Sequence, residues 1–448
     1  MTIKRFPSTI EGLDDILHGG LFEGGVYIFE GPPGVGKTTL ANQMAYNRAA
    51  DGEKTLYVTM LAESHARMVQ HMANQTFFRK SAVNAFVFYL SGYRELETEG
   101  LKGVLGLLRG ELARSGATFL VVDGLVVSAP GIDEGVRQFV HELQSLVTAM
   151  NCTCLVLTTG RGNALSAEQT MVDGIFTLDD QLFRGRAERL VQVRKFRGSA
   201  VVRGQHSFCI TDEGLKFFPR LESLPLQPRE HGPRRTVPLG VREVDEALGD
   251  EGVWAGSMSL AVGESGVGKT LLALRFAAAA DDAAPGLLLL GSAETEVDAC
   301  ALAARFGVDL DGALARGVLR IEPIGQADES LDEMGHKILR LVDELDVKRL
   351  VVDGTAALAD TLAFQDRGYR FLGRLLHELR RRGVTALFTL DPSEIAVASG
   401  TPLATGVAAL FDNVFALEAR SGADVARQLR VGKIRGSLAK AAVFSLPG

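Results

Sequence analysis

The fold is decided by the stretch VYIFEGPPGVGKTTL, residues 26–40, and by its counterpart MSLAVGESGVGKTLL, residues 258–272. Each is a short apolar run followed by the pattern G-x-x-x-x-G-K-[ST]. The glycines of this pattern let backbone N–H groups close around phosphates, and its lysine neutralises the β- and γ-phosphates. A glycine-rich turn after a strand could explain one match, but it does not explain two matches in the same context. The sequence therefore predicts two nucleotide sites.

The nucleotide is expected to contact each loop and the first turn of the helix that follows it. Mg²⁺ is expected to bind the hydroxyl of the threonine that follows the lysine. These segments supply the nucleotide-binding residues Gly31, Gly34, Val35, Gly36, Lys37, Thr38, Thr39, Gly263, Gly266, Val267, Gly268, Lys269, Thr270 and Leu271.

One aspartate ends an apolar run in each half of the chain, in FLVVDG (119–124) and in RLVVDG (349–354). An aspartate at the carboxyl end of a strand beside a phosphate loop can hold the Mg²⁺ shell through water. An Asp-Gly turn closing a buried strand is the plainer interpretation, and its repetition behind each loop argues against it. We therefore predict two metal sites, Thr38 with Asp123 and Thr270 with Asp353.

Hydrolysis also needs a carboxylate that orients or deprotonates the attacking water. The strand after each phosphate-loop helix is predicted to end in a matching segment, Ala-Glu-Ser at 62–64 and Ala-Glu-Thr at 293–295. Glu63 and Glu294 are the candidates for this catalytic role. The alternative is a carboxylate that only stabilises the start of the next helix.

A K-x-R-G motif lies near the end of each half, in LVQVRKFRG and in RQLRVGKIRG. On a strand, the period of two puts the lysine and the arginine on the same face. One interpretation is that these side chains only form a solvent-exposed face of the strand. The residues concerned are Lys195 with Arg197, and Lys433 with Arg435. Because both pairs recur in a chain built around phosphates, we predict that they are catalytic and reach a neighbouring subunit's γ-phosphate.

These motifs recur at a spacing of 230–238 residues, which is a whole domain rather than a solenoid repeat. Five of the fourteen prolines stand in residues 219–238. We predict an ATPase domain at 1–218, a proline-rich linker at 219–237 and a second ATPase domain at 238–448. Within each domain, strands alternate with helices, for example a helix at 37–50, a strand at 55–61 and a helix over 101–116. This order predicts an α/β fold with a mostly parallel sheet flanked by helices.

Composition narrows the class of protein. The 448 residues are 46% apolar with no apolar run long enough to span a membrane, and the four cysteines show no C-x-x-C spacing. We expect a cytoplasmic protein with buried thiols. The net charge of −7 comes almost entirely from residues 239–448, which argues against non-specific nucleic-acid binding. The repeated His-Glu-Leu segments at 141–143 and 377–379 are expected to be helix-surface residues rather than metal ligands.

Taken together, these residues resemble the KaiC-like group of the RecA-type P-loop ATPases over nearly the whole chain. The resemblance covers STIEGLDDILHGGLFEGG before the first loop and VRKFRGSAVVRGQHSFCITDEGL near the end of the first domain. It implies two tandem RecA-like domains, ATP and Mg²⁺ as cofactors, and a homo-hexamer with ATP at the subunit interfaces. It also implies that Lys195, Arg197, Lys433 and Arg435 act on the neighbouring subunit's nucleotide.

This chain departs from the family pattern at two places. Members often carry two adjacent glutamates after the second strand, whereas Ala62 and Ala293 stand at the first of these positions here. The Ser-Thr pair that the clock protein of this group phosphorylates matches Ala408 and Ala409, which have no hydroxyl. Autophosphorylation at that place is therefore not expected.

Three functions are consistent with these residues. The first is a Mg²⁺-dependent ATP hydrolase that assembles as a ring and acts as a signalling or assembly switch, with a signalling protein as partner. The second is a DNA-stimulated motor or recombination mediator of the RadA or DnaB kind, although no nucleic-acid-binding module stands out. The third is a kinase that phosphorylates a partner protein.

Overall fold

A computed structural model describes thirteen segments of the chain. No helix within them is long and apolar enough to cross a membrane. The described residues are 4–60, 65–125, 133–159, 171–183, 186–228, 235–248, 252–291, 294–325, 329–354, 367–392, 404–420, 426–435 and 443–446.

The chain divides into two compact units, Met1–Leu224 and Pro225–Gly448, here called unit 1 and unit 2. The division falls inside the segment 219–237 for which a linker is expected. That segment also contains the short strand β12 (Thr236–Val237), which pairs with β13 (Val253–Trp254) of unit 2. The domain boundaries at 218 and 238 stay a prediction.

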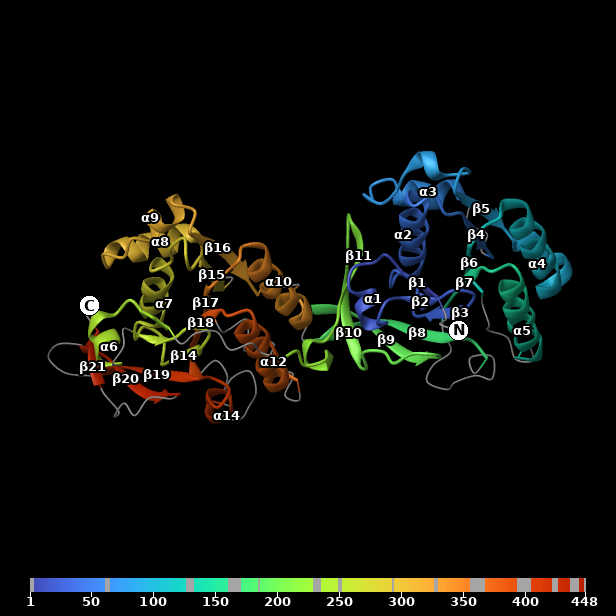
Figure 1. Ribbon diagram of the computed structural model, residues 1–448. Helices are drawn as coiled ribbons and strands as arrows, with labels where there is room; N and C mark the ends of the chain where they lie inside the picture. The colour runs from blue at the N-terminus through green and yellow to red at the C-terminus, as the bar shows by residue number, and fades with distance from the viewer. Residues whose placement is uncertain are drawn as a thin grey trace. The chain divides into compact units, whose positions relative to one another are not determined.

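Unit 1 is built on a nine-stranded sheet in the order β11-β10-β9-β8-β3-β7-β6-β4-β5 (Figure 1). The strands from β8 to β5 run parallel, whereas β9, β10 and β11 continue the sheet by antiparallel pairing. Its strands are β3 (Val26–Glu30), β4 (Thr55–Thr59), β5 (Val87–Ser91), β6 (Phe119–Asp123), β7 (Thr153–Thr158), β8 (Gly174–Phe183), β9 (Arg186–Phe196), β10 (Gln205–Thr211) and β11 (Gly214–Phe218); a separate ribbon pairs β1 (Arg5–Phe6) with β2 (Leu21–Phe22).

Helices cover both faces of this sheet, because successive side chains of each strand point to opposite faces. On β3, Tyr27 and Phe29 join the core beneath α2, whereas Val26 and Ile28 join the core beneath α4 and α5. Helices α4 and α5 lie side by side in Figure 1. The helices are α1 (Leu13–Ile16), α2 (Lys37–Ala50), α3 (His65–Met72), α4 (Tyr93–Ser115) and α5 (Asp133–Ala149).

The expected elements of unit 1 are found with small shifts at their ends. The helix expected at 37–50 is α2, and the strand expected at 55–61 ends earlier, at Thr59. The largest difference is α4, which begins at Tyr93 rather than near residue 101. Gly100 breaks its helical geometry with φ of 65°, and this break separates the unpredicted first turns from the apolar-periodic part.

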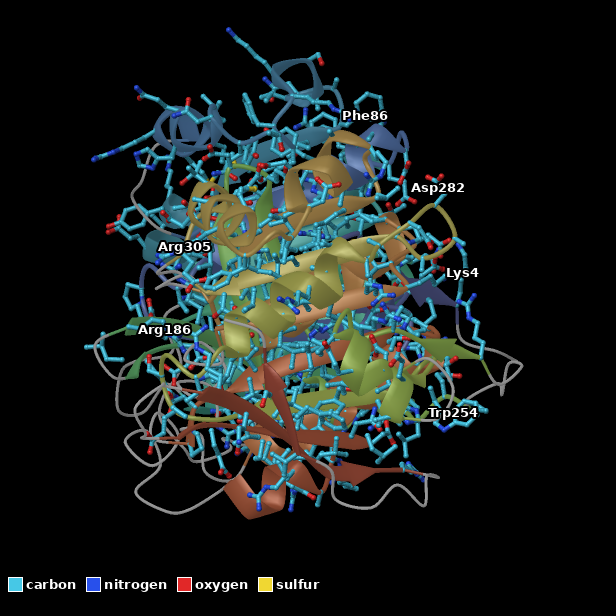
Figure 2. All side chains as sticks on the ribbon, turned by 90° about the vertical axis from the view of Figure 1, so that its left-hand side faces the viewer. Lys4, Phe86, Arg186, Trp254, Asp282 and Arg305 are labelled. Carbon is cyan, nitrogen blue, oxygen red and sulfur yellow. The ribbon has the colours of Figure 1, made fainter. Side chains whose placement is uncertain are left out.

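Unit 2 repeats this architecture with an eight-stranded sheet in the order β16-β15-β17-β18-β14-β19-β20-β21. Charged side chains such as Asp282 and Arg305 project from its surface (Figure 2). Its strands are β14 (Met258–Val262), β15 (Gly286–Gly291), β16 (Leu319–Ile324), β17 (Arg349–Asp353), β18 (Thr385–Leu390), β19 (Asn413–Arg420), β20 (Ala426–Ile434) and β21 (Val443–Leu446). Its helices are α6 (Arg242–Ala247), α7 (Lys269–Ala278), α8 (Glu296–Arg305), α9 (Leu310–Ala315), α10 (Leu331–Glu344), α12 (Gly368–Arg381) and α14 (Ala404–Ala408).

The two sheets have the same strand order around the strand that precedes the phosphate loop, β3 in unit 1 and β14 in unit 2. Even a register shift recurs, at Ile175/Phe176 between β8 and β9 and at Val414/Phe415 between β19 and β20. The prediction of two tandem α/β units with mostly parallel sheets is confirmed.

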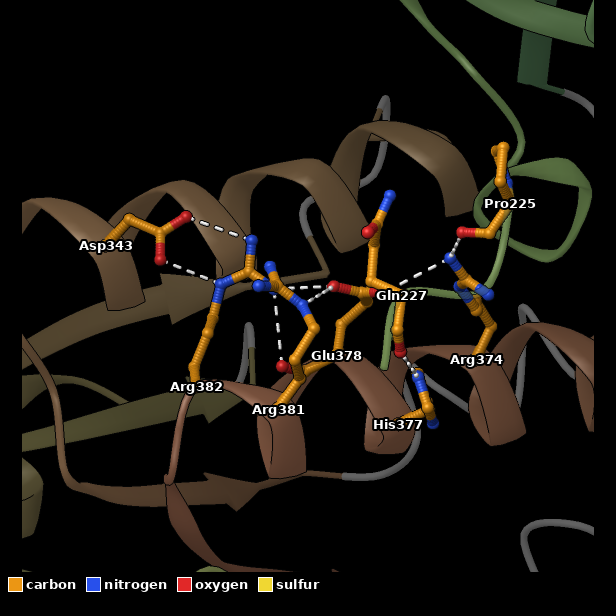
Figure 3. Close-up of polar contacts among 8 residues, drawn as sticks. All are labelled: Pro225, Gln227, Asp343, Arg374, His377, Glu378, Arg381 and Arg382. Carbon is orange, nitrogen blue, oxygen red and sulfur yellow. Dashed lines mark hydrogen bonds and ion pairs between the residues drawn. The ribbon is translucent and has the colours of Figure 1, made fainter. Parts of the chain in front are cut away.

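The first residues of unit 2 are hydrogen-bonded to side chains of α12 (Figure 3). Arg374 Nη2 donates a hydrogen bond to the Pro225 carbonyl, and His377 Nε2 lies 3.1 Å from the Gln227 carbonyl oxygen. The helix-surface expectation for the second His-Glu-Leu segment is therefore wrong for Glu378 and Leu379, which are buried, whereas His377 is half-exposed. His377 contacts the Gln227 carbonyl, and Glu378 is buried and forms ion pairs with three arginines.

Candidate nucleotide and metal sites

The first phosphate loop joins β3 to α2 and has the backbone of an anion-binding loop. Gly34 and Gly36 have φ values of 82° and 110°, which side chains rarely allow. A Cβ on Gly31 would lie 2.3 Å from the Leu178 carbonyl oxygen, so this position also requires glycine. Buried Val35 anchors the loop, while residues 32–34 are exposed. Helix α2 begins without a side-chain cap or an acidic first turn, which leaves its N–H groups for an anion.

Lys37 lies folded back over this loop. Its Nζ donates to the carbonyl oxygens of Gly31 at 2.7 Å and Pro32 at 2.9 Å. Burial lowers its pKa, and the nearby charge of Asp123 partly opposes this shift. A phosphate would offer the ammonium a stronger, charged acceptor than two neutral carbonyls.

Asp123 lies next to the loop at the end of β6 and is held by two hydroxyl groups. Thr38 Oγ1 donates to its Oδ2 at 3.0 Å, and the Tyr57 hydroxyl donates to the same oxygen at 2.7 Å. The threonine hydrogen therefore points to the carboxylate, which leaves the hydroxyl lone pairs for a cation. Thr38 and Asp123 are brought together as the sequence predicts, whereas Tyr57 was not predicted.

The second loop, between β14 and α7, has the same form. Gly266 and Gly268 have φ values of 83° and 104°, and a Cβ on Gly263 would lie 2.5 Å from the Leu417 carbonyl oxygen. Lys269 Nζ again donates to loop carbonyls, of Gly263 at 2.7 Å and Glu264 at 2.8 Å. The predicted loop residues of the two units therefore adopt equivalent positions.

Unit 2 adds a counterion that the sequence analysis missed. Asp391 Oδ2 lies 3.6 Å from Lys269 Nζ, and both side chains are largely buried. Asp391 directly follows β18, the strand next to β14. The matching residue after β7 is Thr159. An acidic residue at the end of a buried strand was the available signal, but only the strand order shows which loop it faces.

The metal-site aspartate of unit 2 has one oxygen without a partner. Thr389 Oγ1 donates to Asp353 Oδ1 at 2.5 Å, whereas buried Oδ2 makes no hydrogen bond to any described residue. A buried carboxylate oxygen left unpaired is costly, and a hydrated cation would satisfy it. Asp353 with Thr270 therefore fits the Mg²⁺ site predicted from the sequence.

Glu294 lies in front of α8 but does not cap this helix. The cap is Thr295, whose side chain accepts from the Asp298 N–H while Asp298 accepts from the Thr295 N–H. Desolvation of the Glu294 carboxylate, followed by the charges of Asp353 and Asp298, raises its pKa. Its carboxylate makes no hydrogen bond or ion pair to the described residues, and the residue is exposed, so its catalytic role stays a prediction. Glu63 lies outside the described residues.

The K-x-R pairs are not near the phosphate loop of their own unit. Lys195 pairs with Ile175 on β8, and Arg197 N donates to Asp173 O just before that strand. Because β8 runs parallel to β3, Arg197 lies at the amino edge of the sheet, whereas the phosphate loop follows the carboxyl edge. Lys433 Nζ donates to the Phe411 carbonyl at 2.6 Å in the matching place.

Arg435 has its own counterion at this amino edge. Its Nη1 lies 3.0 Å from Asp412 Oδ1, and its side chain remains 75% exposed. Asp412 also accepts from Arg380 and from the Met258 N–H. The cation is therefore held in place while it remains accessible to another molecule.

Comparison with known proteins agrees with this geometry. The family model of the KaiC ATPases matches residues 6–222 and 237–446, one match to each unit. The chain belongs to the KaiC family of ATPases. Family membership supports ATP binding and hydrolysis as its general activity.

Curated relatives extend over almost the whole chain. A circadian clock oscillator protein KaiC from Thermostichus vulcanus is 25% identical over 452 residues, which covers 97% of this chain and 86% of the relative. A circadian clock oscillator protein KaiC from Picosynechococcus sp. is 23% identical, and a circadian clock oscillator protein KaiC 1 from Synechocystis sp. is 22% identical, with 97% of this chain and 86% of each relative covered.

A KaiC-family site of this kind needs few protein ligands for its metal. Mg²⁺ in nucleotide sites is held by one or two side chains together with water and phosphate oxygens. Within the described residues there is no cluster of three or more acidic, histidine or cysteine side chains that could hold a metal. Thr38 with Asp123, and Thr270 with Asp353, would hold Mg²⁺, which neutralises phosphate charge when bound.

Proposed function

We propose that this KaiC-family chain is a Mg²⁺-dependent ATPase that forms a homo-hexameric ring with ATP between subunits. The ring acts as a signalling or assembly switch, tight when ATP is bound and looser after hydrolysis. The observation that carries the proposal is the separation of each K-x-R pair from the phosphate loop of its own unit. For these cations to reach a γ-phosphate, the nucleotide has to be bound by another subunit, because the loop of their own unit lies at the opposite end of the strands.

Such an arrangement requires a head-to-tail interface, which closes into a ring when the rotation between subunits allows it. The six-fold number comes from the family resemblance. Each subunit would then contribute its loop to one nucleotide and its K-x-R pair to the next. Removing the cations should weaken the interface because phosphate charge is left unpaired.

Each residue has a separate task in this proposal. The loop N–H groups and Lys37 or Lys269 bind phosphates, and the threonine–aspartate pair holds Mg²⁺. In unit 2, Glu294 orients the attacking water, and its raised pKa suits a group that accepts a proton. The neighbour's lysine and arginine stabilise the charge that develops on the γ-phosphate.

Signalling by autophosphorylation is not part of the proposal. The segment before Asp412 carries Ala408 and Ala409, and neither has a hydroxyl that could accept a phosphoryl group. A partner protein would therefore have to respond to the ATP or ADP state of the ring.

The proposal is tested by subunit mixing. One protein carries Lys37→Ala, which removes the phosphate-binding lysine of unit 1. The other carries Lys195→Ala and Arg197→Ala, which remove its cationic pair. Both also carry Glu294→Gln to suppress hydrolysis in unit 2. Each protein alone should show little phosphate release. In an equimolar mixture, roughly a quarter of interfaces would combine an intact loop with an intact pair.

We expect the mixture to recover a corresponding fraction of the phosphate-release rate of the Glu294→Gln parent. Mixing two preparations of the same mutant is the matched control and should recover nothing. A mixture no more active than its components, although mass measurement shows mixed oligomers, would contradict a site shared between subunits.

A further inference from the structure

The two metal-site aspartates receive their supporting hydroxyl from opposite sides. In unit 1 it comes from Tyr57 on β4, and in unit 2 it comes from Thr389 on β18. Strand β4 and strand β18 are not equivalents, because β4 corresponds to β15 and β18 corresponds to β7 in the common strand order. The same task is therefore performed by residues that the duplication does not relate.

At each position the other unit carries leucine. Tyr57 pairs with Val121 two residues before Asp123, and Leu288 pairs with Val351 two residues before Asp353. Leu157 pairs with Asp123 itself. On the other side, Thr389 follows Phe388, which pairs with Val352, and so lies beside Asp353. Tyr57 and Leu288 are therefore equivalent positions, and so are Leu157 and Thr389. Each aspartate has a hydroxyl on one side and a leucine on the other, and the two units have them on opposite sides.

We propose that Tyr57 in unit 1 and Thr389 in unit 2 are the positioning residues of the Mg²⁺ sites. Each donates a hydrogen bond to one oxygen of the aspartate and thereby fixes the orientation of the carboxylate at the Mg²⁺ site. This inference rests on the proposed function, since it assumes that each unit binds Mg²⁺ together with ATP.

The burial of these groups supports a role at the metal site. The Tyr57 side chain is completely buried, and a buried phenol needs an acceptor. In unit 2 the Thr389 hydroxyl engages Oδ1, and the unpaired oxygen is Oδ2. Groups that orient a metal-site carboxylate commonly change metal affinity by 10- to 100-fold when removed.

The two sites also differ in the hydrogen bonds that their aspartates accept. In unit 1, Tyr57 and Thr38 both donate to Asp123 Oδ2. In unit 2, the described residues show Thr389 as the hydroxyl donor to Asp353 and no hydrogen bond from Thr270. Unit 1 therefore presents a threonine already oriented for Mg²⁺, and we expect it to reach half-saturation at lower Mg²⁺ than unit 2.

The test measures binding rather than activity, in the full chain. Fluorescent ATP is titrated with Mg²⁺ in a Lys269→Ala parent, which reports unit 1, and in a Lys37→Ala parent, which reports unit 2. We expect Tyr57→Phe to raise the half-saturating Mg²⁺ of unit 1 by about 10-fold. Binding in EDTA should be unchanged. Thr389→Val should do the same in unit 2 and should leave unit 1 unaffected.

Rescue distinguishes a positioning role from a packing role. In the Tyr57→Phe protein, Leu157→Thr supplies a hydroxyl from the side that unit 2 uses, and it should restore most of the Mg²⁺ response. Tyr57→Leu, which copies the residue of unit 2, is a second variant compatible with this fold. It should weaken the Mg²⁺ response as Tyr57→Phe does.

Three results would overturn the inference. If the parent binds ATP with Mg²⁺ and Tyr57→Phe leaves the Mg²⁺ response unchanged, Tyr57 is not a positioning residue. The proposed function would not be affected by this result. Equal losses with Mg²⁺ and with EDTA would show that Tyr57 acts on packing. Parents without any Mg²⁺-dependent binding would instead refute the proposed function, and the inference with it.

Discussion

At the scale of single residues, Glu294 is distinguished by what its carboxylate does not do. Asp298 completes the cap of α8, Asp391 pairs with Lys269, and Asp353 accepts from Thr389. Glu294 has no hydrogen bond or ion pair to the described residues, although its carboxylate is partly desolvated near Asp353. An exposed carboxylate near Asp353 that has no partner among the described residues is available to a water molecule.

We therefore predict that Glu294→Gln lowers phosphate release from unit 2 by at least about 100-fold, the usual contribution of a general base. The measurement is made in the Lys37→Ala protein, where unit 2 alone binds nucleotide. ATP affinity should change by less than about twofold, because glutamine keeps the shape of the side chain.

Asp298→Asn is the matched control, since it removes the neighbouring acid that belongs to the helix cap. It should lower the thermal midpoint only slightly, because asparagine keeps a side-chain oxygen that can accept from the Thr295 N–H, and it should leave phosphate release nearly intact. If Asp298→Asn abolished hydrolysis and Glu294→Gln did not, the assignment of the base would be wrong.

At the scale of elements, α12 carries a network of ion pairs around Glu378, whose side chain is buried. Glu378 accepts from Arg381 Nε at 3.0 Å and Arg382 Nη1 at 2.8 Å, and Arg374 Nη2 lies 3.1 Å away (Figure 3). Burial alone would favour the neutral acid, but these three arginines outweigh it and lower the pKa of Glu378. Because Arg374 also donates to the Pro225 carbonyl, the network positions the first residues of unit 2.

We predict that Glu378→Gln destabilises unit 2 by about 3 kcal/mol, since breaking a buried ion pair leaves the remaining charge uncompensated. For a unit of this size the thermal midpoint should fall by roughly 6–12 °C, measured by calorimetry. The control is Arg242→Gln, which removes an exposed pair with Glu246 and should shift the midpoint very little.

The pH dependence has a definite sign. A folded-state pKa below the unfolded value means that the Glu378 contribution is complete above about pH 4.3 and disappears as the pH falls further. The difference between wild type and Glu378→Gln should therefore shrink on acidification. A difference that grew below pH 4 would contradict this account.

At the scale of the whole molecule, two units with the same strand order each present a phosphate loop at one sheet edge and a K-x-R pair at the other. Neither unit completes a nucleotide site within itself under the proposed function. ATP would then stabilise the oligomer by binding only to the assembled form.

We predict that Lys37→Ala combined with Lys269→Ala prevents ATP-dependent oligomerisation, as measured by light scattering with and without ATP and Mg²⁺. The single mutants should show which unit holds the ring together. Oligomers of full size in the double mutant without nucleotide would contradict the prediction, because assembly would then not depend on bound phosphate.

The sequence by itself determined the architecture and the backbone form of each phosphate loop. The glycine spacing of the loops specifies backbone conformations that few other residues adopt, and alternating strands and helices imply a parallel sheet. Thr38, Asp123 and Asp353 could be predicted for the same reason, since each lies at a fixed place relative to a loop or a strand end.

Only the tertiary structure decided which groups support these residues. Tyr57 and Thr389 belong to strands that precede or follow the aspartates by tens of residues, and no local pattern marks their hydroxyls. Likewise, Glu378 resembles an ordinary helix-surface acid until packing surrounds it with arginines. The phosphate loops depend on residues close together in the sequence, so their spacing predicts them. Hydrogen bonds across a sheet depend on the strand order, which brings distant residues side by side.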